Sequence, residues 1–133
     1  DVEPTRELLV PQGNYVLVKR FSAKEERRRI VACLYDCTCI RSPRIGFENH
    51  LNYFHSTGHG FSRDLARGLA SYLNSTAVDL YFRHFSGHTQ VNATDLRSLK
   101  YPSLKKLMAL GVKVRDAVLD QSALDDLVHA EVF

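Results

Sequence analysis

Cysteine is scarce in this sequence, and its placement excludes two common kinds of small domain. The three cysteines, Cys33, Cys37 and Cys39, lie close together and are odd in number. A secreted disulfide framework needs paired cysteines spread along the chain, and a zinc knuckle usually contains Cys-x2-Cys. We therefore expect neither disulfides nor a metal site, and a reducing, cytoplasmic compartment.

Long hydrophobic runs are also missing. No apolar run approaches the roughly 18 residues that a membrane helix needs, and the acidic start at Asp1 has none of the basic and apolar character of a signal peptide. We therefore expect no membrane partner. The chain does not begin with methionine and its single methionine is Met108, which we interpret as the sign of a piece excised from a larger protein.

The strand pattern comes first along the chain. A length of 133 residues is the usual size of one domain, so 1–133 is treated as a single unit. β-Branched and alternating residues predict strands over 15–20, 29–36 and 50–55, with loops over 1–14 and 37–48. The first two strands should be antiparallel because a short charged turn joins them. The second is apolar on both faces, which favours a central position.

The helical pattern follows the strands. Apolar residues at helical spacing predict five helices, over 62–73, 76–85, 94–100, 104–111 and 122–133. Strands followed by helices favour the α+β class, here a small curved, mainly antiparallel sheet with packed helices.

The segment Ser86–Pro102 carries the most information about function. Gly87 is suited to ending the preceding helix. Asn92 or Thr94 can cap a short helix with Asp95 in its first turn and Pro102 beyond its end. Before this helix lie polar side chains that can hydrogen-bond base edges or phosphates, namely His88, Thr89, Gln90 and Asn92.

Together with the stretches 15–22, 47–54 and 73–83, this segment resembles the C-terminal target recognition (specificity) domain of Type II restriction-modification DNA adenine-N6 methyltransferases. It is also similar to the recognition domains of Type I specificity subunits. The resemblance covers roughly residues 13–102 and implies a small curved sheet with helices packed on one side. It implies double-stranded DNA as the partner, and a separate catalytic methyltransferase domain in the parent protein, with or without a fused nuclease.

The residue pattern predicts an entry loop over 1–14 and an acidic C-terminal helix over 112–133. The resemblance implies that the part between them, 15–111, is the recognition domain. The catalytic motifs of the family are absent: its Asn/Asp-Pro-Pro-Tyr/Phe loop needs adjacent prolines, and none of the four prolines are adjacent. The glycine pair Gly58 and Gly60 lacks the phenylalanine and helix opening of a cofactor turn. We expect a non-catalytic chain, with S-adenosylmethionine bound elsewhere in the parent.

Basic side chains are concentrated in the body of the chain. Residues 61–115 carry nine basic and three acidic side chains, whereas residues 116–133 carry five acidic ones and no lysine or arginine. A basic body suits a polyanionic partner such as duplex DNA. Further candidates for DNA contact lie in the charged turn and in the loop after the second strand, namely Lys24, Arg27, Arg28, Arg29, Arg41 and Arg44.

Each candidate has a structural alternative. The polar residues 88–92 could scaffold a turn, and the arginines could form solvated faces or surface salt bridges. A single docking surface requires Arg27, Arg44 and Gln90 to lie on one side of the molecule. For the whole chain, the alternative is a protein-interaction module that docks a partner subunit through its helical half, using the acidic C-terminal helix.

Overall fold

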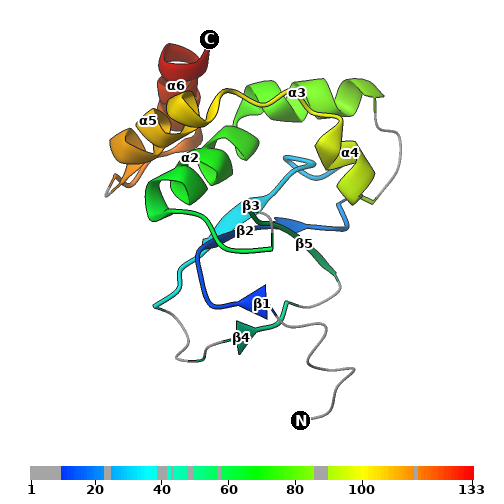
Figure 1. Ribbon diagram of the computed structural model, residues 1–133. Coiled ribbons are helices and arrows are strands. Elements are labelled where there is room, and N and C mark those ends of the chain that lie inside the picture. Colours follow the sequence, from blue (N-terminus) through cyan, green and yellow to red (C-terminus); the bar gives the residue numbers. More distant parts are fainter. Residues whose placement is uncertain are drawn as a thin grey trace.

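A three-stranded antiparallel sheet lies at the centre of the fold, between a group of helices and a smaller two-stranded sheet (Figure 1). Its strands are β2 (Tyr15–Lys19), β3 (Ala32–Tyr35) and β5 (Leu51–Phe54), in the order β3–β2–β5. The smaller sheet pairs β1 (Val10–Pro11) with β4 (Arg44–Ile45). This computed structural model describes residues 10–22, 25–38, 42, 44–47, 50–56, 58–85, 90–115 and 117–133.

Five helices follow the strands in the described part of the chain, α2 (Arg63–Leu73), α3 (Thr76–Phe85), α4 (Ala93–Arg97), α5 (Leu104–Val114) and α6 (Gln121–Val132). They gather on the side of the central sheet opposite β1 and β4 (Figure 1). The predicted α+β class and the antiparallel pairing of the first two strands are confirmed. The helix predicted over 94–100 is shorter than expected, because α4 ends at Arg97.

Alternation along β2 decides which face of the sheet carries the core. Val16 and Val18 are fully buried and belong to one apolar cluster with Leu69, Leu73 and Phe82 of the helices. Successive side chains of a strand point to opposite faces, so this pair marks the helix-covered face. The sheet is therefore held to the helices by a single apolar layer.

The second predicted strand is shorter than expected, and the prediction that it is central is wrong. β3 begins only at Ala32, and β2 lies between β3 and β5. Val31 is 38% exposed and Cys33 is exposed, so one face of β3 is open to solvent. The apolar run was longer than the strand because Ile30, which is fully buried, precedes the strand and packs into the core on its own.

β1 and β4 lie in segments that the sequence predicts to be loops. Each has two residues, and Val10 pairs with Ile45 while Pro11 pairs with Arg44. A proline is tolerated in such an edge strand, where its missing N–H breaks no continuous ladder. Two residues are too few to show an alternating pattern, so the sequence offers no periodic signal for this pair.

Two glycines set the packing of α2 against α5. A Cβ added to Gly68 would overlap the carbonyl group of Leu107, and one added to Gly111 would overlap the carbonyl group of Asp64. The two helices therefore touch backbone to backbone at both positions. The prediction that Gly111 ends its helix is wrong, because α5 continues to Val114 and Gly111 is needed for close approach within it.

The side chain of Asn74, the residue that ends α2, closes the outer edge of β3. Its carboxamide accepts a hydrogen bond from the N–H of Ala32 and donates one to the carbonyl of the same residue, both at 2.8 Å. It thus satisfies both backbone groups that Ala32 turns away from β2. The backbone carbonyl of Asn74 accepts hydrogen bonds from Arg28 and Gln121, at 2.7 and 2.9 Å. One residue therefore joins the sheet, the β2–β3 turn and α6.

We expect Asn74→Ala to lower the free energy of unfolding by about 2 kcal/mol, because it leaves a buried N–H and a buried carbonyl of Ala32 without their side-chain partners. Asn74→Asp should cost at least as much, since a carboxylate cannot donate to the Ala32 carbonyl. Urea unfolding with an unchanged m-value is the measurement. A loss below about 0.5 kcal/mol in both variants would show that water replaces the carboxamide without penalty.

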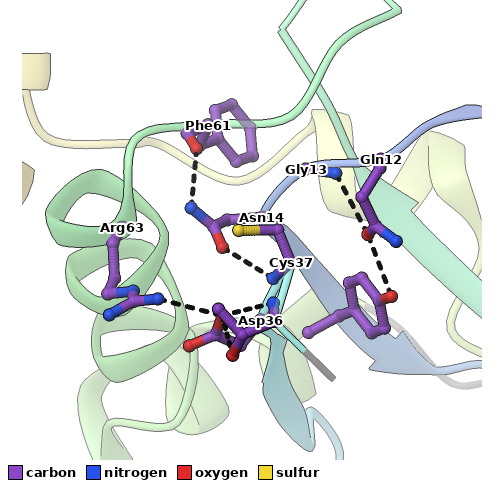
Figure 2. Close-up of polar contacts among 9 residues, drawn as sticks. Gln12, Gly13, Asn14, Asp36, Cys37, Phe61 and Arg63 are labelled. Carbon is purple, nitrogen blue, oxygen red and sulfur yellow. Dashed lines mark hydrogen bonds and ion pairs between the residues drawn. The ribbon is translucent and has the colours of Figure 1, made fainter. Parts of the chain in front are cut away.

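Figure 2 shows how the sheet is joined to the beginning of α2. The side chain of Asn14 donates a hydrogen bond to the carbonyl of Phe61 at 3.2 Å. The carboxylate of Asp36 accepts hydrogen bonds from the N–H of Thr38 at 2.9 Å and from Arg63 at 3.0 Å. The hydrogen bonds from Thr38, followed by the Arg63 guanidinium, hold the pKa of Asp36 below its usual value. The carboxylate is therefore ionised at neutral pH and links the end of β3 to α2.

Candidate nucleic-acid interface

Gln90, the first described residue of the predicted polar segment, lies beside the end of β2. It is half-buried and forms an isolated antiparallel bridge with Phe21. The N–H of Val91 donates to the carbonyl of Arg20 at 2.6 Å. The extended conformation predicted for this stretch is thus seen at Gln90 and Val91, where it prolongs the edge of the sheet.

Asn92, one of the two cap residues that the sequence offers, directly precedes α4. It occupies the N-cap position in an extended conformation, and its N–H donates to the carboxylate of Asp95 at 3.2 Å. Asn92 therefore has the structural role that the sequence analysis gave as its alternative. A direct contact between Asn92 and DNA stays a prediction. His88 and Thr89 lie outside the described residues.

The charged turn between β2 and β3 places its arginines in three different environments. Arg27 is exposed to solvent. The guanidinium of Arg28 donates to the carbonyl of Asn74 and ties the turn to the end of α2. Arg29 is fully buried. Lys24 lies outside the described residues.

Arg29 belongs to the core, which corrects its assignment to the DNA-binding surface. Its guanidinium lies 5.3 Å from the ring centroid of Phe82, within cation–π range. Its Nε donates to the hydroxyl of Ser22 at 3.0 Å, and its backbone N–H donates to the carboxylate of Asp79 at 2.7 Å. A fully buried side chain cannot reach DNA, and its partners come from segments that local sequence does not connect to it.

Arg44 and Arg27 do not share a surface. Arg44 is exposed in β4, below the sheet, whereas the turn that carries Arg27 is bonded to α3 through the hydrogen bond from Arg83 to the carbonyl of Glu26. Figure 1 shows β4 and α3 at opposite ends of the molecule. The common surface expected for Arg27, Arg44 and Gln90 is therefore not formed. Arg41 lies outside the described residues.

A groove between β5 and α4 brings together residues of the kind that bind nucleic acid. It has a volume of about 420 Å³, and its lining residues come from β5, its continuation at His55, α4 and Tyr101. Asn52, Tyr53 and His55 supply polar and aromatic groups from one wall, and Arg97 supplies a cation from the other. In the described sheet β5 is an edge strand, so this wall faces no further strand.

Hydrogen bonds fix the orientation of several groups in this groove. Asn52 donates to the carbonyl of Val91 at 2.7 Å, which attaches the predicted polar segment to the groove wall. Nδ1 of His55 accepts from the N–H of Gly58 at 2.7 Å. In the neutral imidazole the proton then lies on Nε2, so His55 offers a donor. Burial first, and the neighbouring Tyr72 second, raise the pKa of Tyr101.

The sequence analysis did not single out several groove residues that the structure brings together, namely Asn52, Tyr53, His55, Arg97 and Tyr101. Asn52 and Tyr53 lie in a strand that was correctly predicted, but nothing local shows that it is an edge strand with one wall open. Arg97 lies within the segment Ser86–Pro102, in the last turn of α4. Attention to the exposed cations of that helix, and not only to the polar residues before it, would have found it.

The C-terminal helix, expected to dock a partner subunit, uses its apolar face within this chain. Val128 is 1% exposed, and Leu124, Leu127 and Val132 pack against the core. The predicted helix and its amphipathic character are confirmed, but this face is not free for a partner.

None of the helices in the described ranges is long and apolar enough to cross a lipid bilayer.

The chain is similar to segments of two curated proteins. Over 127 residues, 96% of this chain, it is 46% identical to the Type II methyltransferase M.PstI of Providencia stuartii. Over 109 residues, 82% of this chain, it is 55% identical to the Type II methyltransferase M.BsuBI of Bacillus subtilis. The chain is homologous to a segment of Type II methyltransferases. It spans about a quarter of the length of these relatives. No family model matches the chain, and no solved structure matches it.

Proposed function

We propose that this chain is a sequence-specific recognition domain for double-stranded DNA, belonging to a cytoplasmic Type II restriction-modification adenine-N6 methyltransferase. The observation that carries the proposal is the 55% identity of this chain, over 109 residues, to a segment that makes up 22% of a Type II methyltransferase. A methyltransferase divides its work between recognising a site and transferring a methyl group. A chain without the family's catalytic motifs, but with a polar and cationic groove, fits the first task.

The proposed division assigns chemistry to the rest of the parent enzyme. Its catalytic domain would bind S-adenosylmethionine and receive the target base, which must leave the helix stack to be methylated. This chain would hold the duplex beside that domain. Its proposed DNA contacts are the groove between β5 and α4, the half-buried Gln90 and the exposed Arg27.

We expect the full chain to bind duplex DNA and to enrich a short common sequence from a pool of randomised duplexes. Affinity should fall steeply with salt, because each phosphate contact contributes about −0.9 to the slope of log K against log salt. Fluorescence anisotropy of the selected duplex against a scrambled one measures both affinity and specificity. Absence of any enrichment, with no duplex binding at low salt, would contradict the proposal.

The alternative, a protein-interaction module, is favoured by one surface feature. Leu104, Met108 and Val112 follow each other one turn apart on α5 and are 67%, 43% and 49% exposed. Residues at this spacing share one helix face, which suits docking against another apolar surface. If light scattering shows a stable oligomer and the duplex pool shows no enrichment, this second function is the better one.

A further inference from the structure

We propose that the groove between β5 and α4 is a phosphodiester-binding site, and that Arg97 is its principal phosphate-binding side chain. This inference rests on the proposed DNA recognition and specifies where one strand of the duplex is held. The interface would then centre on Arg97 and not on the arginines that the sequence analysis named. Arg97 would position the DNA backbone, and other residues would read the bases.

Among the residues that the structure describes, none neutralises the charge of Arg97. Its side chain is exposed in the last turn of α4, and it makes no ion pair or hydrogen bond with any residue that the structure describes. The carboxylate within α4, that of Asp95, bonds to the N–H of Asn92 at the other end of the helix. Arg97 therefore supplies an uncompensated cation at the groove, and a guanidinium matches the paired oxygens of a phosphate.

A second donor lies in the same groove. Because Nδ1 of His55 accepts from Gly58, the opposite nitrogen of the neutral ring carries its proton and can donate to a phosphate oxygen. Arg97 and His55 come from α4 and from the end of β5, the two walls of the groove. The bound anion would thus be held by both walls, which no feature of the local sequence indicates.

The floor of the groove is aromatic and rigid. Tyr101 donates a hydrogen bond to the carbonyl of Leu96 at 2.6 Å and meets Phe54 edge-on at 6.1 Å between ring centroids. Because burial raises the pKa of Tyr101, its hydroxyl keeps its proton and this hydrogen bond persists at neutral pH. Tyr53, 39% exposed, also lines the groove, and its ring packs against Tyr15 and Phe47. A rigid floor fixes the depth at which the backbone can lie.

The hydrogen bond from Asn52 to the carbonyl of Val91 connects this site with the polar residues 88–92, which were predicted to contact base edges or phosphates. The hydrogen bond at 2.7 Å holds the stretch Gln90–Asn92 against the groove wall. A strand gripped by Arg97 would therefore lie next to Gln90, so the phosphate contact would set the register of any base contact. This is the ordinary division between backbone contacts that position and base contacts that specify.

The test compares Arg97→Ala and Arg97→Lys with Lys105→Ala, which removes the same charge from an exposed site on α5. Binding of the full chain to the selected duplex and to a scrambled duplex is measured over a salt series. We expect Arg97→Ala to weaken both duplexes alike, by roughly tenfold, and to reduce the salt slope by about 1. Arg97→Lys should recover most of the slope, and Lys105→Ala should change little. Thermal unfolding confirms that each variant is folded.

Four results would overturn the inference. Equal weakening by Arg97→Ala and Lys105→Ala would show only the effect of net charge. Weakening confined to the selected duplex would make Arg97 a base reader. Unchanged affinity in Arg97→Ala, with normal binding by the unsubstituted chain, would exclude the groove while the proposed recognition function stands. If the unsubstituted chain binds no duplex, the proposed function fails and the inference fails with it.

Discussion

Gly111→Ala is expected to destabilise the fold by about 3 kcal/mol, although alanine is the better helix former. In an exposed helical position the same change should stabilise by about 1 kcal/mol through propensity. Here the added methyl group would overlap the Asp64 carbonyl of α2, a backbone group that cannot rotate away as a side chain can. The helices must separate, and the packing between them is lost along their length.

The control for this prediction is Ala109→Gly, on the exposed side of the same helix. It should cost only the propensity difference of about 1 kcal/mol. Gly68→Ala should behave like Gly111→Ala because it faces the Leu107 carbonyl. The double variant should cost less than the two single costs added together, since one separation of the helices accommodates both methyl groups. Urea unfolding of the four variants measures these costs. A stabilised Gly111→Ala would refute the backbone contact.

Asp79→Ala is the second substitution with a large expected effect. Asp79 is 6% exposed on α3, and its carboxylate accepts hydrogen bonds from the backbone N–H of Arg29 at 2.7 Å and from Arg83 at 2.9 Å. Removing one partner of a buried ion pair leaves uncompensated charge and costs about 3–5 kcal/mol. The cost should lie near the lower end, because Arg83 is 30% exposed and can regain water.

Two further variants separate charge from hydrogen bonding at this site. Asp79→Asn can still accept from the N–H of Arg29 but lacks the negative charge, so it should cost less than Asp79→Ala. Asp126→Ala removes an exposed carboxylate from α6 and should change the free energy of unfolding by no more than about 0.5 kcal/mol. If Asp79→Ala resembles Asp126→Ala, the buried carboxylate does not anchor the turn.

The ion pair between Asp79 and Arg83 also bears on function, because it helps to fix the position of Arg27. The turn that carries Arg27 is held by Asp79 through Arg29, by Arg83 through Glu26, and by Asn74 through Arg28. Of the arginines in this turn, two therefore build the fold, and only Arg27 is exposed to a partner. A run of basic residues in a sequence thus overstates the cationic surface whenever its members face different sides of a turn.

Local pattern was sufficient to predict the class of the fold. The alternation of 15–20, the helical spacing after Ser62 and the placement of Asn92 before a short helix were all confirmed, because each depends on residues within one or two turns of each other. The strand order was not predicted, because an apolar run shows that a segment is buried but not which neighbours bury it. The expectation of a central β3 failed for that reason.

The sequence by itself determined that this chain is a small α+β domain with a basic body and an acidic end. Only the tertiary structure decided which basic side chains are exposed and which of them lie on the same surface. Arg29 is buried because Asp79 and Phe82, some fifty residues later, fold over it. The groove exists because β5 lies at a sheet edge beside α4, across a similar gap in sequence. Burial and juxtaposition depend on contacts between distant segments, and no local pattern records them.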